Sequence, residues 1–282
     1  MGGYILNFVD VLRELNGGVR EKFLSLFNWF KSVERPVLVA FSGGVDSSVV
    51  LAVASLALGR DSVIAVTATS PIHHEEDLLW AKRIAEILAV RHVIIESREL
   101  EDTNFISNPP NRCYFCKKDL AEELSKVARE FGAKTIVDGT NASDLNSYRP
   151  GLLAFAEAGV RSPLADAGIT KDEVREIAKA LKLPNWDRPP MSCLATRIPH
   201  GERITIEKLE RIAEAEKVVK ILTGARLVRV RDHGYIARIE VGKDERKRFF
   251  NENIMDKLAE ELQKLGYKYV MLDLYGYRSE PR

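Results

Sequence analysis

The fold is decided by the stretch Pro36-Val37-Leu38-Val39-Ala40-Phe41-Ser42-Gly43-Gly44-Val45-Asp46-Ser47. Residues 36–41 form an apolar run that predicts a buried β-strand. The rest is a short turn that opens an apolar segment, which predicts a helix through about residue 58. A strand that leads directly into a helix is the repeating unit of parallel α/β sheets. We therefore expect this turn at the carboxyl end of a strand, where such sheets bind their ligands.

The residues of the turn indicate an anion-binding loop. Gly43 and Gly44 let the backbone approach an anion and adopt dihedral angles that other residues avoid. Backbone N–H groups of the turn and of the helix start then point at the anion. Ser42 and Ser47 add hydroxyl donors, whereas Asp46 is a poor partner for phosphate and is expected to bind a bridging Mg²⁺. A plain strand-to-helix turn is the alternative, which six matching positions disfavour.

This pattern resembles the PP-loop, the pyrophosphate-holding turn of ATP pyrophosphatases. No Gly-Lys-Ser/Thr is present in it, so it is not a Walker loop. Enzymes with a PP-loop split ATP between the α and β phosphates and place AMP on an oxygen of the substrate, which nitrogen or sulfur then displaces. The resemblance implies ATP and Mg²⁺ as cofactors of residues 42–47.

Composition sets outer bounds. The chain has 282 residues, a hydrophobic fraction of 45% and a net charge of +1, so there is no global electrostatic reason to expect a nucleic-acid partner. The first residues do not read as a signal peptide, and no apolar run reaches membrane-spanning length. Three cysteines, an odd number, argue against a secreted disulfide framework. We expect a cytoplasmic protein with no membrane partner.

Apolar periodicity predicts alternating helices and strands along most of the chain. Residues 5–34 are expected to be helical with a break at Gly17-Gly18, further strands are expected at 62–67, 92–96 and 135–137, and further helices at 75–88, 117–131 and 171–182. This order predicts right-handed crossovers and a parallel sheet. The fold class is therefore α/β, and the PP-loop resemblance implies a Rossmann-like domain of the adenine nucleotide alpha hydrolase kind.

Three polar loops follow neighbouring strands and should meet at one rim of the sheet. They are the PP-loop, the segment 67–70 and the segment Asp138-Gly139-Thr140-Asn141. We expect Asp138 and Asn141 to contact nucleotide or metal, Thr140 to lie near the phosphates, and Thr67 to contact adenine or ribose. Polar loops without a ligand are the alternative.

A second domain is predicted after the Pro-rich residues 184–203. Its expected elements are a helix at 206–222, strands at 226–231 and 235–241 joined at Gly234, a helix at 244–265 and a strand at 268–274. We therefore place a PP-loop domain, with N-terminal helices and cysteine loops, at 1–204 and a small α-β-β-α-β domain at 205–282.

The cysteines form a second constellation. Cys113 and Cys116 make a Cys-x-x-Cys pair and Cys193 follows 77 residues later, all expected in polar or Pro-rich loops. Three thiolates can hold three irons of a [4Fe–4S] cluster and leave the fourth iron open. Zinc with a fourth ligand such as His200, a redox pair with Cys193 as a nucleophile, and inert structural cysteines remain alternatives.

Five segments together resemble the LarE family over nearly the whole chain. They are residues 42–47, 111–117 (Asn-Arg-Cys-Tyr-Phe-Cys-Lys), 138–144, 149–151 (Arg-Pro-Gly) and 192–201. LarE proteins are ATP-dependent sulfur transferases that make the nickel-pincer nucleotide cofactor of lactate racemase. The resemblance implies adenylation of a carboxylate of pyridinium-3,5-biscarboxylic acid mononucleotide, and then its conversion to a thiocarboxylate.

Two sulfur chemistries occur in that family, and the cysteines distinguish them. Members with only the cysteine that matches Cys193 sacrifice its sulfur and retain dehydroalanine. Members with all three resemble cluster-dependent catalysts, in which a [4Fe–4S] centre relays added sulfide. Because this chain has Cys113, Cys116 and Cys193, the resemblance implies the second type, with sulfide or a sulfur-donor protein as partner. It also implies a homo-oligomer.

Arginines are expected to bind the anionic nucleotide substrate, because a guanidinium pairs bidentately with carboxylate and phosphate. Arg197 lies four residues after Cys193, and Arg229 and Arg231 alternate on one strand face, where both could meet one phosphate. A solvated strand face with surface ion pairs is the alternative for the latter two. His73 and His74 could bind a metal, but a solvated loop after Pro71 is the favoured expectation.

Two rival functions stay open. A tRNA thiolase shares the PP-loop and sometimes a three-cysteine cluster, but the near-neutral charge and the lack of an RNA-binding module disfavour it. An amidating ligase of the NAD or GMP synthetase kind uses ammonia and has no need of three cysteines.

Overall fold

The computed structural model describes residues 7–146 and 148–278, and divides into two compact units. The first unit comprises the chain up to residue 70 together with 75–99 and 111–188. The second comprises 71–74, 100–110 and the chain from 189 onward. The chain thus passes between the units several times, and the single domain boundary at 204/205 stays a prediction.

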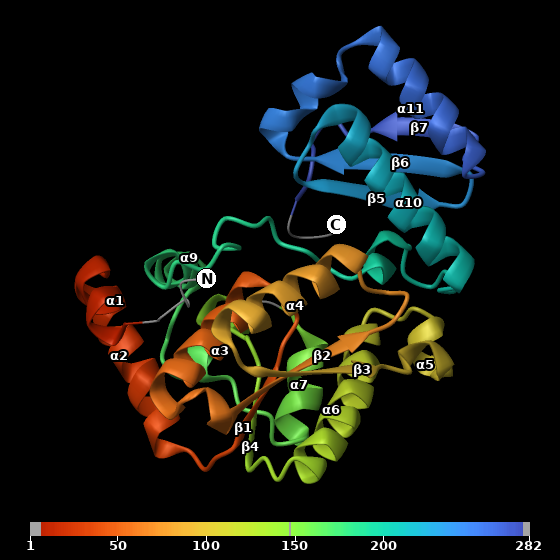
Figure 1. Cartoon of the computed structure of the whole chain (residues 1–282). Helices are drawn as coiled ribbons and strands as arrows, with labels where there is room; N and C mark the ends of the chain where they lie inside the picture. The colour runs from red at the N-terminus through yellow and green to blue at the C-terminus, as the bar shows by residue number, and fades with distance from the viewer. Residues whose placement is uncertain (1–6, 147, 279–282) are drawn as a thin grey trace. The chain divides into compact units, whose positions relative to one another are not determined.

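A parallel sheet of four strands is the centre of the first unit (Figure 1). Its strands are β1 (Val37–Ala40), β2 (Val63–Thr69), β3 (Arg91–Glu96) and β4 (Thr135–Val137), in the spatial order β3-β2-β1-β4. Val37 lies opposite Val63 on one side and Thr135 on the other. The order reverses beside β1, so the turn after β1 lies at the switch point where doubly wound sheets bind ligands.

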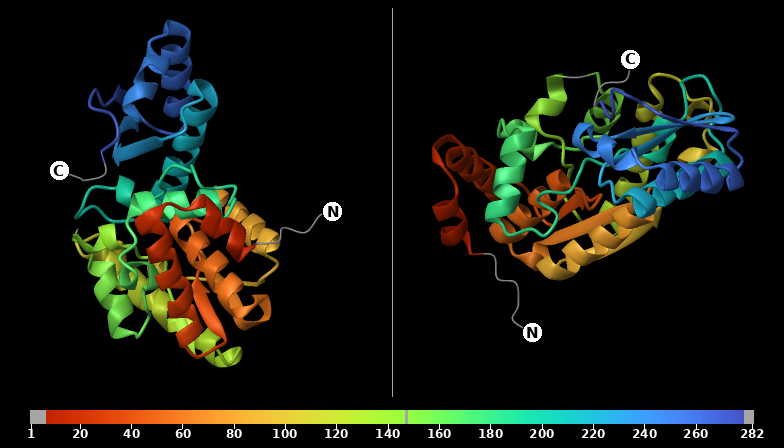
Figure 2. Two further views of the ribbon diagram at one scale, coloured as in Figure 1. Left: turned by 90° about the vertical axis from the view of Figure 1, so that its left-hand side faces the viewer. Right: turned by 90° about the horizontal axis from the view of Figure 1, so that it is seen from above.

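Helices cover both faces of this sheet, as the predicted α/β class requires. One face packs against α2 (Gly17–Ser32), α3 (Val45–Leu58), α4 (Glu75–Leu88) and α9 (Lys171–Ala180), and Figure 2 shows α2 beside α3. The other face packs against α6 (Arg112–Glu130) and α7 (Pro150–Glu157). Because both faces of β1 are buried, its side chains form a continuous apolar run rather than an alternating one.

The N-terminal helical region differs from the expectation in one respect. It forms α1 (Phe8–Glu14) and α2, but the break lies at Leu15-Asn16, and Gly17 and Gly18 begin α2. Asn16 has the extended backbone of an N-cap residue, so α2 starts directly after it and includes both glycines. Residues 5 and 6 of the predicted region lie outside the described residues.

Several short elements were not predicted. They are the helices α5 (Thr103–Ile106) and α8 (Pro163–Asp166) and the 3₁₀ turns η1 (Arg60–Ser62), η2 (Glu99–Glu101), η3 (Ala142–Asn146), η4 (Leu194–Arg197) and η5 (Lys243–Phe249). Helix α7 was also missed. Elements of one or two turns carry little periodicity, which explains why the sequence pattern did not indicate them.

The second unit contains a mixed sheet with two helices over one face. Strands β5 (Val228–His233) and β6 (Ile236–Val241) are antiparallel, and β7 (Tyr269–Leu272) pairs parallel with β6. Helices α10 (Ile206–Thr223) and α11 (Glu252–Lys264) lie side by side over this face (Figures 1 and 2). Gly234, with φ of 69°, makes the predicted hairpin turn.

The helix predicted at 244–265 is wrong in its first half. Residues Lys243–Phe249 form η5, and α11 starts afresh after Asn251, whose side chain accepts a hydrogen bond from the Ile254 amide. Among residues 7–146 and 148–278, no helix combines the length and hydrophobicity that crossing a membrane requires.

Candidate active site

The turn after β1 is built as an anion-binding loop. Gly43 has φ of +72°, and a Cβ on it would lie 2.7 Å from the Ala81 backbone nitrogen of α4. Gly44 is the N-cap residue of α3, so the helix that starts there directs its unpaired N–H groups toward the turn. Only glycine satisfies both the dihedral angle and the close approach at position 43.

The two serines of the loop bond each other and the loop backbone. Ser42 Oγ and Ser47 Oγ lie 3.1 Å apart, and the Gly44 amide donates to Ser42 Oγ at 3.3 Å. Ser47 Oγ in turn donates to the Gly44 carbonyl at 3.2 Å. When a phosphate binds, these two hydroxyls could donate to its oxygens instead of bonding to each other.

Asp46 lies beside the loop after β4. The Asn141 side-chain amide donates to Asp46 Oδ1 at 2.8 Å. Burial raises the pKa of Asp46 above its ordinary value, the Asn141 hydrogen bond opposes that shift, and the nearby Asp144 adds to it. A buried carboxylate that resists ionisation gains from a bound cation, so its surroundings suit the predicted Mg²⁺.

The loop after β4 reaches the PP-loop as predicted, and its side chains bond one another. Gly139 packs so closely that a Cβ would lie 2.7 Å from the Ser47 amide nitrogen. Asp138 accepts from the Thr140 amide at 3.1 Å, from the Thr140 hydroxyl, and from Ser162 Oγ at 2.7 Å. The nucleotide contacts expected of Asp138, Thr140 and Asn141 stay predictions.

Thr67 sits at the same rim. Its hydroxyl donates to the Phe41 carbonyl at 2.7 Å and lies 2.8 Å from His92 Nε2. Burial, and secondarily Lys82, lowers the pKa of His92, so its neutral ring can donate to the Thr67 oxygen. The hydroxyl therefore ties the end of β2 to the end of β1, and its predicted contact to adenine or ribose stays a prediction.

Asn185 was not identified from the sequence. This residue is 0% exposed, and its side-chain amide donates to the Gly43 carbonyl at 3.0 Å and to Ser48 Oγ at 2.9 Å. It follows α9, far along the chain from the turn that it holds. No sequence signal marks an asparagine in a Pro-rich segment as a partner of residue 43.

Cys113 and Cys116 lie in a helix, so the expectation that they occupy a loop is wrong. α6 begins at Arg112, five residues earlier than predicted, because Asn108-Pro109-Pro110 ends the preceding segment and residues 113–116 continue the helical turn. At a spacing of three residues both thiols lie on one side of the helix. Cys113 is exposed and Cys116 half-buried. The helix start favours negative charge, which suits thiolate ligands.

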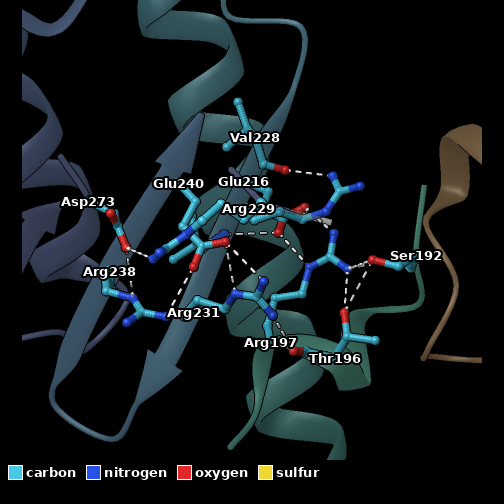
Figure 3. Close-up of polar contacts among 12 residues, drawn as sticks. Ser192, Thr196, Arg197, Glu216, Val228, Arg229, Arg231, Arg238, Glu240 and Asp273 are labelled. Atoms are coloured by element: carbon cyan, nitrogen blue, oxygen red, sulfur yellow. Dashed lines mark hydrogen bonds and ion pairs between the residues drawn. The ribbon is translucent and has the colours of Figure 1, made fainter. Parts of the chain in front are cut away.

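Cys193 precedes the turn η4 in the second unit and is half-buried. Its loop is held by Arg197, whose terminal nitrogen donates to the Ser192 carbonyl at 2.7 Å (Figure 3). The same nitrogen donates to the Cys193 carbonyl at 2.9 Å. The same nitrogen lies 2.9 Å from Thr196 Oγ1. The cysteine loop therefore wraps around a guanidinium.

Glu216 on α10 anchors that guanidinium from the other side. It accepts from Arg197 Nε at 2.7 Å and from a terminal nitrogen at 3.1 Å, and both residues are 1% exposed. Burial alone would raise the pKa of Glu216, but Arg197, His74 and Arg229 outweigh it and lower the pKa.

His74 belongs to the same cluster, which corrects the expectation of a solvated loop. Its side chain is buried, with Nε2 3.3 Å from Arg197 and 3.7 Å from Glu216. All three guanidinium nitrogens of Arg197 thus face protein acceptors. The prediction that Arg197 binds substrate stays untested, and its contacts favour a positioning role.

Arg229 and Arg231 share one face of β5, and neither lies on a solvated strand face. Arg231 pairs with Glu240 at 2.9 Å and donates to the Thr196 carbonyl at 2.6 Å (Figure 3). Arg229 is buried and donates to the carbonyls of Val228 and Pro190. Burial, with the charge of Arg197, lowers the pKa of Arg229 to about 10. Among the described residues, no carboxylate forms an ion pair with it.

The chain is similar in sequence to one protein family and to several known proteins. The family model of the asparagine synthase domain matches residues 32–110, which include the PP-loop. The chain is 41% identical over 93% of its length to an uncharacterised protein of Synechocystis, of which it covers 96%. It is 39% identical over 88% of its length to the pyridinium-3,5-bisthiocarboxylic acid mononucleotide synthase of Lactiplantibacillus plantarum, of which it covers 89%.

The chain belongs to the LarE family. It is therefore an ATP-using sulfurtransferase with a PP-loop domain. A more distant relative is a glutamine-hydrolysing GMP synthase of Methanococcus maripaludis, which is 33% identical over 66% of the chain and 63% of that protein. This second likeness covers less of the chain and is lower in identity than the first two.

The iron–sulfur cluster that the family resemblance implies can be tested against the donor set. Cys113 and Cys116 fit as two thiolate ligands from one helix turn, and Cys193 supplies the chemistry of a third. Within the described ranges no group of three or more His, Cys, Asp or Glu side chains is arranged as a metal site. The donors suit the cluster in kind, and the cluster itself remains a proposal.

Proposed function

We propose that this LarE-family protein adenylates a carboxylate of pyridinium-3,5-biscarboxylic acid mononucleotide and then replaces one carboxylate oxygen with sulfur. The carboxylate attacks the α-phosphorus of ATP and releases pyrophosphate, and sulfide then attacks the acyl carbon and expels AMP. The product of one round is a thiocarboxylate, and a second round treats the other carboxylate. The observation that carries the proposal is the PP-loop together with 39% identity to a synthase of the bisthiocarboxylic acid product.

The ATP half of the reaction is assigned to the rim of the parallel sheet. The amides of Gly43 and Gly44 and the hydroxyls of Ser42 and Ser47 would bind the pyrophosphate that leaves, where the helix start adds partial positive charge. Asp46 would bind the Mg²⁺ that neutralises it, since a cation would stabilise the charge that burial disfavours on this carboxylate. Oriented donors of this kind stabilise charge that develops on the leaving group.

The sulfur half is assigned to the three cysteines. Cys113, Cys116 and Cys193 would hold a [4Fe–4S] cluster, which supplies an open iron able to carry sulfide. Arg197 and Glu216 fix the carbonyls of Ser192 and Cys193 and thereby orient the third thiol. In this proposal the three cysteines serve as ligands of the cluster, and none of them gives up its own sulfur atom to the substrate.

The substrate phosphate is assigned to Arg229, with Arg231 beside it. Arg229 is buried, its Nε has no hydrogen-bond partner among the described residues, and no carboxylate there pairs with it. Glu216, which is paired with Arg197, offsets the charge of Arg229 only in part, so a phosphate would gain affinity there. Arg231 already pairs with Glu240 and would contribute a weaker share.

Turnover of purified protein tests the proposal. With ATP, Mg²⁺, sulfide and the biscarboxylic acid mononucleotide, AMP, pyrophosphate and thiocarboxylate should form together. Asp46→Asn should abolish pyrophosphate release, whereas Cys193→Ser and Cys113→Ala should retain it and lose the thiocarboxylate. Pyrophosphate release with tRNA, and none with the mononucleotide, would instead support the thiolase alternative.

Direct sulfur donation from Cys193 remains the second candidate for the sulfur step. The exposed Cys113 favours the cluster proposal, because a sacrificial mechanism has no use for a Cys-x-x-Cys pair at a helix start. The sulfur donor and the homo-oligomer stay predictions.

A further inference from the structure

The segment Arg149-Pro150-Gly151 has no part in the mechanism above. It connects the loop after β4 to α7, and Pro150 is the first residue of that helix, where its fixed φ favours helix initiation. The start of α7 lies against the start of α6, the helix that carries Cys113 and Cys116. Figure 1 shows the two helices beside each other on one face of the sheet.

Gly151 allows this contact. A Cβ at this position would lie 3.1 Å from the Cys113 carbonyl oxygen and 2.8 Å from Lys117 Cγ. Gly151 is buried and its φ is not positive, so packing rather than backbone conformation requires glycine. Lys117 Nζ also lies 4.2 Å from the centre of the Phe155 ring, one turn further along α7. The cysteine-bearing turn is therefore seated on α7.

The other end of the segment is tied to the nucleotide loop. Arg149 pairs with Asp144 at 2.7 Å. The Asp144 side chain accepts from the Asn141 amide at 3.2 Å, and the Asp144 amide donates to Asn141 Oδ1 at 3.3 Å. Asn141 donates to Asp46 at 2.8 Å. A continuous series of contacts thus runs from the proposed Mg²⁺ ligand to the backbone of Cys113.

We propose that Arg149 and Gly151 are positioning residues that fix the cysteine pair of α6 relative to the PP-loop, so that occupancy of the nucleotide site is transmitted to the sulfur site. This inference rests on the proposed division between an ATP half and a sulfur half. Bound nucleotide and Mg²⁺ would restrict the motion of Asp46 and of Asn141, which donates to it. Asn141 in turn restricts Asp144. Arg149, which pairs with Asp144, then restricts the start of α7. The Gly151 contact passes it to the turn that holds the thiols.

A graded pair of variants tests the contact. Gly151→Ala places a Cβ 2.8 Å from Lys117 Cγ and 3.1 Å from the Cys113 carbonyl oxygen, so a neighbouring group must shift, and Gly151→Val requires a larger shift. Sulfur transfer should fall progressively, by about 10²-fold in Gly151→Val, because small misplacements of reacting groups have effects of that size. ATP–pyrophosphate exchange should stay close to that of wild type, because the Cβ added at residue 151 meets Lys117 and Cys113 rather than the PP-loop. Gly18→Ala is the matched control, since a Cβ there meets nothing within 4 Å.

Hydrogen exchange on protein prepared without iron supplies a readout that does not depend on turnover. The Lys117 amide, four residues after Cys113 in α6, is placed by helix geometry to donate to the Cys113 carbonyl that Gly151 faces. A non-hydrolysable ATP analogue with Mg²⁺ should slow exchange in residues 112–118 of the wild type. The same addition should have no such effect in Gly151→Val or Arg149→Gln, which should still bind the analogue.

The outcomes separate this inference from the proposed function. Sulfur transfer by Gly151→Val at the wild-type rate overturns the positioning role. So does hydrogen exchange in residues 112–118 of the wild type that is the same with and without bound nucleotide. Wild-type protein that makes no thiocarboxylate overturns the proposed function, and the exchange experiment still decides the coupling.

Discussion

Glu216→Gln should weaken the second unit and disorder the cysteine loop. Both partners of the Glu216–Arg197 pair are 1% exposed, so neither charge is compensated by water. The substitution leaves the guanidinium of Arg197 buried beside that of Arg229 with no carboxylate to neutralise either. Removing one partner of a buried ion pair lowers the free energy of unfolding by about 3–5 kcal/mol. The Val230 amide also loses its carboxylate acceptor, at 3.0 Å.

Urea denaturation followed by circular dichroism measures this change. Glu261→Gln is the control, because the Glu261–Lys264 pair is exposed to solvent and should contribute little to stability. The lowered pKa of Glu216 predicts that wild-type stability from this pair is full near neutral pH and declines as acid protonates it. The double variant Arg197→Met/Glu216→Leu should recover stability without sulfur transfer. A Glu216→Gln loss no larger than the control's would refute the reasoning.

Three further substitutions test other parts of the site. Gly43→Ala forces a Cβ to 2.7 Å from Ala81 and should reduce ATP–pyrophosphate exchange at least about tenfold, and wild-type exchange would contradict the loop geometry. Asn185→Ala leaves the Gly43 carbonyl without its donor and should lower the free energy of unfolding by about 1–3 kcal/mol while raising the KM for ATP; an unchanged melting curve would count against it. Because the PP-loop can also bind phosphate, inorganic phosphate should raise the melting temperature of wild type more than that of Arg229→Met, and equal shifts would exclude a phosphate site at Arg229.

The ATP half of the site was predictable from sequence because its information is local. A buried strand, two glycines and a helix start lie within one short stretch of consecutive residues, and their order specifies both geometry and chemistry. The rim formed with residues 138–141 followed from parallel topology, and the Asn141–Asp46 hydrogen bond confirms that these loops meet. The α/β class and the family were correct for the same reason.

The sulfur half was less predictable because its partners are distant in sequence. Nothing in the sequence near Arg197 indicates that Glu216 and His74 lie against its guanidinium. From sequence alone, an arginine close to a reactive cysteine could equally be a substrate ligand or a residue that positions the loop. The start of α6 was misplaced because a polar Cys-x-x-Cys turn has the composition of a loop. The support that Gly151 gives to Cys113 depends on helix packing, which periodicity alone does not describe.

The central claim, that three cysteines serve a renewable sulfur transfer, is tested most directly by one measurement on anaerobically purified protein. Iron and acid-labile sulfide are determined, and the mass of the Cys193 peptide is compared before and after turnover. We predict about four irons per chain, lost in Cys193→Ala, and an unchanged Cys193 peptide. Protein without iron, whose Cys193 peptide has lost the mass of H₂S, would contradict this claim and establish Cys193 as the consumed sulfur donor.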